Sequence, residues 1–218
     1  MSRTDRPPGK LTVSEAKGIQ LALRDKVVQD DRFSGPRYVA GVDVGFKDRR
    51  TARGAVVVLE FPSLTLRDQA FASAPVTFPY VPGYLSFREV PVVLKALAKL
   101  QLKPDIILCD GQGLAHPRRF GFACHLGVIA NVPSIGVAKT RLIGDYREPG
   151  CQKGAWMPLK HNNADIGAVL RTRTDKRPLF VSVGHRISLA AAIKIVLACC
   201  TKYRLPETTR AAHRLASD

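Results

Sequence analysis

The chain has 218 residues, enough for one large domain with a substantial core, and its 45% hydrophobic content excludes an intrinsically disordered protein. Its 34 lysines and arginines outnumber 18 acidic residues, and the resulting net charge of +16 favours a polyanionic partner, most commonly nucleic acid. The sequence contains no signal peptide, no 18-residue apolar run and no basic amphipathic helix, so a membrane partner is not expected. Five cysteines without a CxxC pair indicate thiols in a reducing compartment. We therefore expect a soluble, cytoplasmic protein.

The residue pattern of the N-terminal part of the chain predicts an arm, then a helix, then a sheet of neighbouring strands. Residues 1–10 are polar and contain proline and glycine, which is typical of a flexible arm. Thr12 and Glu15 form a capping-box pattern, and apolar residues then recur at helical spacing, so an amphipathic helix is expected over residues 12–29. The short intervals that follow favour an antiparallel meander, with strands over Tyr38–Phe46, Ala52–Phe61 and Thr65–Val76.

Asp43 lies inside the first of these strands, among apolar neighbours. A carboxylate rarely occupies such a position unless it is paired or bound to a metal. An exposed position on an edge strand is the alternative, and periodicity alone leaves both open.

The segment FPYVPGYLSFRE, residues 78–89, combines a rigid turn with a helix start. Pro79 and Pro82 stiffen the backbone around Tyr80, which can hold the aromatic ring away from the body to stack on, or push between, nucleic acid bases. A proline-rich turn with Tyr80 packed inward is the alternative. Ser86 and Glu89 form a second capping-box pattern for a helix that runs to about residue 100. Glu89 either closes that first turn or points toward a metal.

The apolar run Ile106–Cys109 predicts a buried strand of a mostly parallel sheet, and it ends on Asp110, Gly111, Gln112 and Gly113. Ligands of open α/β sheets bind beyond the carboxyl ends of strands, where glycine allows close approach of a backbone or a phosphate. His116 stands where a dinucleotide-binding G-x-G-x-x-G motif requires its third glycine, so that motif is excluded. A glycine turn beside an incidental aspartate remains the alternative.

The rest of the chain continues the alternation of helices and strands. A small helix is predicted over residues 121–127, and a strand over residues 133–139 brings Lys139 to the same sheet edge as Asp110, although a solvated lysine is the usual case. Residues 146–160 are rich in glycine and proline and are expected to be irregular. Two further strands are expected over residues 165–172 and 179–184, then a helix from Ser188 to about residue 203 and a last helix that begins at Pro206 and carries His213.

In these motifs the chain closely resembles the endonuclease V family of deoxyinosine-specific endonucleases. The resemblance rests on VAGVDVGF, PYVPGYLSFRE, CDGQGLAHPRRFGFACHLGV, SIGVAKTRLIG and RLPETTRAAH, and it covers nearly the whole chain. It implies a single domain over residues 1–218 with an α/β, ribonuclease H-like fold, in which helices flank a central mixed sheet of an antiparallel meander and parallel strands.

The resemblance also implies the site. Asp43, Glu89 and Asp110 would be the metal-binding carboxylates, Lys139 the catalytic lysine near the scissile phosphate, and His116 a further catalytic residue. His213 stands where relatives carry either aspartate or histidine near the metal. The substrate-binding residues would be the wedge Pro79-Tyr80-Val81-Pro82, which separates the strands at the lesion, and Gly83, Leu85 and Gly111, which would help form the pocket for the flipped base. Arg118 would be a further DNA-binding residue.

The reaction implied by the family is DNA repair: hydrolysis of the second phosphodiester bond 3′ to deoxyinosine, leaving a 3′-OH and a 5′-phosphate. Mg²⁺ would be the cofactor, with Mn²⁺ expected to replace it, because carboxylates and water are the ligands of such ions. We expect a monomer that binds DNA containing deoxyinosine. An endoribonuclease acting on inosine in RNA and a non-catalytic nucleic-acid-binding domain are the two alternatives, and the sequence does not separate DNA from RNA.

Overall fold

The computed structural model describes residues 11–46 and 50–217, so the predicted arm over residues 1–10 lies outside the described part. A single eight-stranded mixed sheet has the order β3-β2-β1-β4-β5-β8-β7-β6. The strands are β1 (Tyr38–Phe46), β2 (Thr51–Glu60), β3 (Thr65–Pro75), β4 (Ile106–Cys109), β5 (Ser134–Ala138), β6 (Trp156–His161), β7 (Ala164–Leu170) and β8 (Leu179–His185). The helices are α1 (Val13–Arg24), α2 (Ser86–Leu97), α3 (Phe122–Ala130), α4 (Leu189–Ala198) and α5 (Glu207–Ser217).

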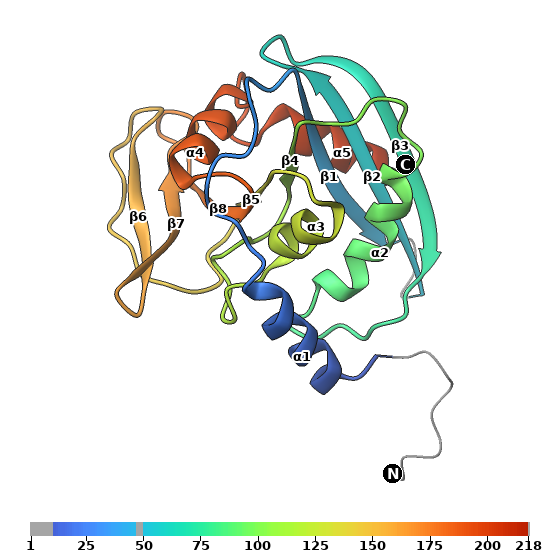
Figure 1. Ribbon diagram of the computed structural model, residues 1–218. Coiled ribbons are helices and arrows are strands. Elements are labelled where there is room, and N and C mark those ends of the chain that lie inside the picture. The colour runs from blue at the N-terminus through green and yellow to red at the C-terminus, as the bar shows by residue number, and fades with distance from the viewer. Residues whose placement is uncertain (1–10, 47–49, 218) are drawn as a thin grey trace, which may run out of the picture.

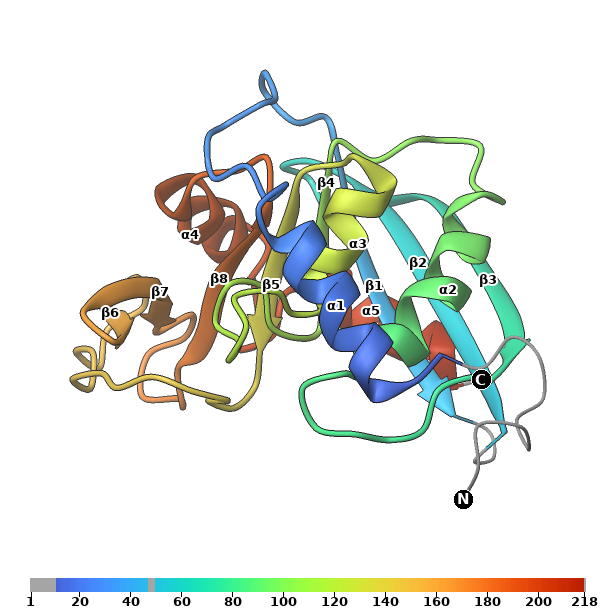
Figure 2. The same cartoon turned by 60° about the horizontal axis from the view of Figure 1, so that its bottom comes forward.

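Helices cover both faces of the sheet, which confirms the predicted fold class (Figure 1). One face packs against α2 and α3, and the other against α4 and α5, while α1 lies outside α3 (Figure 2). Side chains of β4 divide between the two cores, since Leu108 faces α4 and α5 whereas Ile107 faces α2 and α3. Among the described residues, no helix has the length and apolar character needed to cross a membrane.

The prediction of a mostly parallel sheet is wrong. Only β4 pairs in parallel, with β1 on one side and β5 on the other, and the remaining pairings within the described residues are antiparallel. The apolar run of β4 reflects burial on both faces, which helices impose here on a sheet of mixed direction.

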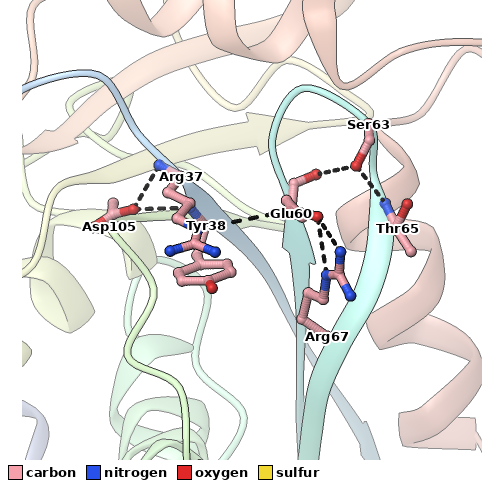
Figure 3. A network of polar contacts seen from close by, with 7 residues as sticks. All are labelled: Arg37, Tyr38, Glu60, Ser63, Thr65, Arg67 and Asp105. Carbon is pink, nitrogen blue, oxygen red and sulfur yellow. Dashed lines mark hydrogen bonds and ion pairs between the residues drawn. The ribbon is translucent and has the colours of Figure 1, made fainter.

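The register between β1 and β4 brings two predicted site residues to one end of the sheet. Val42 lies opposite Cys109, and the amide of Asp110 donates to the carbonyl of Val42, so Asp43 inside β1 and Asp110, which directly follows β4, are neighbours. At the other end, Oδ2 of Asp105 accepts hydrogen bonds of 2.8 Å from the amides of Arg37 and Tyr38, which joins the starts of both strands (Figure 3).

Figure 3 also shows the contacts that join the strands of the β2–β3 hairpin near the start of β1. Glu60 at the end of β2 accepts a hydrogen bond of 3.0 Å from Nε of Arg67 on β3, and Arg37 lies within ion-pair distance of the same carboxylate. These contacts therefore join the meander to the parallel strands at the end of the sheet opposite the predicted site.

Helix boundaries show which capping predictions were right. Thr12 and Glu15 form the predicted capping box, but α1 ends at Arg24, short of the expected residue 29. The second predicted box is wrong: Leu85 is the N-cap of α2, and the hydroxyl of Ser86 contacts Nδ1 of His125 at 3.1 Å. Glu89 is therefore not used in capping.

Further boundaries differ from prediction, and α3, predicted over residues 121–127, continues to Ala130. The helix α2 ends at Leu97 and α4 at Ala198, both earlier than expected. Residues 146–160 are not wholly irregular, because β6 begins at Trp156. This strand lies at the sheet edge, is largely solvent-accessible and contains Pro158, so it lacks the apolar alternation that marks a strand in sequence.

Candidate active site

Three carboxylates converge at the carboxyl ends of β1 and β4. Asp43 lies on β1, Asp110 follows β4, and Glu89 lies in the first turn of α2. Burial and the charges of Asp43 and Asp110 raise the pKa of Glu89 to about 8. Burial also raises the pKa of Asp110, against the opposing effect of Lys139. The crowding of negative charge at this point favours either a proton or a cation.

Two basic side chains occupy the edge of this cluster. Nζ of Lys139, which directly follows β5, donates to Oδ2 of Asp110. Nδ1 of His213 on α5 donates to Oδ2 of Asp43 at 2.6 Å, although the two residues are 170 positions apart in sequence. The backbone carbonyl of Lys139 accepts a hydrogen bond of 3.0 Å from Nη2 of Arg204, which holds the lysine at the strand end.

Glycines in β1 allow α5 to come this close. Gly41 and Gly45 lie on the same face of β1 as Asp43, two residues to either side of it. A Cβ at Gly41 would lie 2.1 Å from the backbone carbonyl carbon of Thr208, and one at Gly45 would lie 2.5 Å from the carbonyl oxygen of Ala216. The missing side chains therefore set α5 directly on β1, with His213 above Asp43.

A pocket of about 360 Å³ adjoins the carboxylates. Nine of the predicted site residues line it, namely Tyr80, Pro82, Gly83, Leu85, Glu89, Asp110, Gly111, His116 and Lys139. The sequence prediction missed further lining residues, including Phe122, Thr140, Arg141 and Leu142. The volume lies in the range of pockets that enclose a small organic ligand, which a nucleobase is.

Tyr80 projects from this pocket into solvent. Tyr80 is 68% exposed, whereas the nearby Phe78 is 2% exposed and packs with Tyr84 and Phe87. The alternative of an inward-packed Tyr80 is therefore wrong. Val81 packs against the same aromatic cluster, so within the predicted wedge it anchors the segment while Tyr80 stands out.

The carbonyl of Gly83 fixes the loop between Tyr80 and α2. It accepts hydrogen bonds from Nε2 of Gln20 (3.0 Å), Nε2 of His116 (3.0 Å) and Nη2 of Arg118 (2.6 Å), and Gly83 itself has φ +80°. The predicted site residue Arg118 therefore acts on the loop and does not line the pocket. Gln20 was missed, although it falls four residues after the buried Ala16 on the apolar face of α1.

Both ring nitrogens of His116 take part in this arrangement. The amide of Arg118 donates to Nδ1 at 3.2 Å, so Nε2 carries the hydrogen that Gly83 accepts. Burial, with the nearby charge of Arg118, lowers the pKa of His116 to about 4. The ring is thus neutral near pH 7, and in this geometry it holds the loop.

Comparison with known proteins identifies the family of the chain. The family model of endonuclease V matches residues 21–214, which include Asp43, Glu89, Asp110 and every residue that lines the pocket. The chain belongs to the endonuclease V family. The endonuclease V of Nostoc sp. is 58% identical over 213 residues, which are 97% of this chain and 96% of that protein.

Solved endonuclease V structures share the fold. The crystal structure from Streptomyces avermitilis has a TM-score of 0.92 and 46% identity, and the match covers 97% of this chain and 94% of that one. Endonuclease V of Ciona intestinalis, crystallised with a 24mer DNA containing an inosine followed by a ribo-adenosine, has a TM-score of 0.84 and 33% identity over 94% of this chain and 96% of that one. As an endonuclease V, this chain is a nuclease that hydrolyses nucleic acid.

The carboxylate oxygens at the centre of this site fit a hard divalent cation. In the described part of the chain, no group of three or more histidine, cysteine, aspartate or glutamate side chains is arranged to enclose an ion by itself. Mg²⁺ nevertheless prefers a site in which a few carboxylate oxygens bind it and water or phosphate oxygens fill the remaining coordination positions. The raised pKa of Glu89 reports the same concentration of negative charge, which a cation would relieve.

Proposed function

We propose that this protein recognises deoxyinosine in DNA and hydrolyses the second phosphodiester bond 3′ to it, leaving a 3′-OH and a 5′-phosphate, with Mg²⁺ as cofactor. The observation that carries the proposal is the joining of an exposed ring, Tyr80, and a base-sized pocket to a wall made of Glu89, Asp110 and Lys139. The DNA bound by the Ciona relative contains an inosine, which supports the choice of lesion.

Lesion recognition would use the exposed ring and the pocket together. A base within a duplex must be rotated out of the stack to be inspected, and an inosine pair, being weaker than a normal pair, costs less to open. Tyr80 would fill the gap left by that base. The backbone at Gly83 and Gly111 would approach the edge of the extruded purine, because neither residue has a side chain to keep the base away.

Hydrolysis would take place where the pocket meets the carboxylates. Asp43, Glu89 and Asp110 would hold the cation, with Nε2 of His213 as the nitrogen left free by its bond to Asp43. When bound, Mg²⁺ supplies activation of a water and stabilisation of the leaving 3′-oxygen. Glu89 must release its proton for this, and Lys139, half-exposed beside Asp110, would neutralise the charge that grows on the phosphate.

A substrate comparison tests the proposal. DNA, RNA and mixed oligonucleotides of one sequence, each with a single inosine, would be incubated with Mg²⁺, with Mn²⁺ and with chelator. We expect a metal-dependent nick at the second bond 3′ to the inosine in DNA. Cleavage of the RNA alone would favour the endoribonuclease. Mixed strands are included because the DNA in the Ciona complex carries a ribo-adenosine after the inosine. Binding without cleavage under every condition would favour a non-catalytic domain.

We also propose that the protein acts as a monomer in the cytoplasm. Four of its cysteines are buried as free thiols, which suits a reducing compartment. Light scattering at working concentration tests the monomer, and fractionation of the source cells tests the compartment.

A further inference from the structure

A second cleft lies beside the catalytic cluster, on the face of the sheet opposite the base pocket. It measures about 250 Å³, and Asp110, Lys139, Thr209, Arg210, His213 and Arg214 line it. Asp110 and Lys139 also line the base pocket. The base pocket is otherwise built from the α2 and α3 side and the cleft from α5, so the two cavities flank the site of hydrolysis.

The cleft has two arginines and, apart from Asp110, no carboxylate in its lining. Arg214 is exposed, and no hydrogen bond or ion pair joins its side chain to another described residue. A free guanidinium beside the phosphodiester-cleaving centre is suited to bind a phosphate, because its fork of N–H donors matches phosphate oxygens.

Arg210 is held in place before any ligand arrives. Its guanidinium carbon lies 3.5 Å from the ring centroid of Tyr203, and Nη1 donates to Oε2 of Glu207 at 2.6 Å. Both contacts restrict the side chain, so less conformational entropy is lost when a remaining N–H group binds an anion. Arg210 is therefore an oriented donor, and Arg214 is the guanidinium that has no partner among the described residues.

We propose that this cleft binds the backbone phosphate that follows the scissile bond on the side away from the lesion. The inference rests on the proposed function, because that function directs the strand from the base pocket across Asp110 and Lys139 and into the cleft. The cleft is smaller than pockets that enclose a whole drug-sized ligand, which suits a phosphate with its sugar and not a second extruded base.

Charge removal on both partners tests the contact. Arg214→Gln would be combined with an inosine oligonucleotide in which one neutral methylphosphonate replaces the phosphate 3′ to the scissile one, and binding would be measured in chelator so that no strand is cut. Arg32→Gln is the matched control, since Arg32 is exposed and lies near Pro104 and Pro133, at the opposite end of the sheet.

We expect each single change, in the arginine or in the phosphate, to weaken binding about five- to tenfold, and the two together to weaken it no further. The slope of log Kd against log salt should fall by about one for Arg214→Gln. Arg32→Gln should combine additively with the neutral linkage.

Additive losses with Arg214→Gln overturn the subsite, and so does coupling to a neutral linkage placed 5′ to the lesion instead. Unchanged binding by Arg214→Gln overturns it as well. These outcomes differ from failure of the proposed function, in which the unaltered protein does not cut inosine DNA at all. Equal melting temperatures of parent and variant would show that the loss of binding is not caused by a loss of stability.

Discussion

Removal of the Tyr80 ring separates recognition from stability. Tyr80 is 68% exposed, so Tyr80→Ala should leave the free energy of unfolding nearly unchanged. If the ring stacks in the gap left by an extruded base, its loss removes roughly 1–3 kcal/mol of binding. At about 1.4 kcal/mol per decade, the affinity for inosine DNA should fall about 5- to 150-fold, while binding to undamaged duplex stays nearly constant.

The neighbouring Phe78 supplies the contrast within the same segment. It is 2% exposed and packs against Phe87 with ring centroids 5.5 Å apart, so Phe78→Ala should cost about 3–5 kcal/mol of stability. Affinities would be measured by fluorescence anisotropy and stabilities by thermal melting, with Tyr80→Phe as the variant that keeps the ring and most of the affinity. A Tyr80→Ala protein that melts far below the parent, or that loses both kinds of DNA equally, refutes the reasoning.

Asp43→Asn and Asp110→Asn should each lower the cleavage rate by several orders of magnitude while DNA binding survives, and near-normal rates in both would remove the metal assignment. The pKa of Glu89 is raised to about 8 from 4.5, so its contribution to stability is full below about pH 4.5 and is lost as the pH rises through about 8. Melting of the metal-free protein should therefore decline across that window, and less in Glu89→Gln. His116→Gln should raise KM more than it lowers kcat, because the ring holds the Gly83 carbonyl; a lost alkaline or acid limb of the pH profile would indicate proton transfer instead. Affinity for undamaged DNA should fall steeply with salt, given the net charge of +16, and a flat dependence would place DNA binding elsewhere.

The sequence best predicts the site residues that directly follow a buried strand. Asp110 and Lys139 each come directly after an apolar run, and parallel pairing places the ends of β4 and β5 side by side, so their meeting could be expected. The projection of Tyr80 between prolines was also predictable, because a restricted backbone is a local property.

Contacts between distant segments could not be predicted in the same way. The bond of Gln20 to the Gly83 carbonyl spans 63 positions, and only the packing of α1 brings them together. The capping box at Ser86 and Glu89 failed because both side chains find tertiary surroundings that outweigh a local cap: His125 for Ser86, and the carboxylate cluster for Glu89. The strand β6 was not predicted because a strand at an exposed sheet edge needs no alternation of apolar residues.

The contact between β1 and α5 makes this protein sensitive to genetic variation at a position that carries no functional group. A single codon change from Gly41 to alanine adds one methyl, which would meet the backbone of Thr208 at 2.1 Å. Backbone atoms within a helix cannot turn aside as a side chain can, so α5 must shift as a unit and carry His213 and Arg214 with it. A substitution that looks conservative in an alignment would therefore behave as an active-site lesion, and Gly41 and Gly45 should tolerate less evolutionary drift than many exposed charged residues.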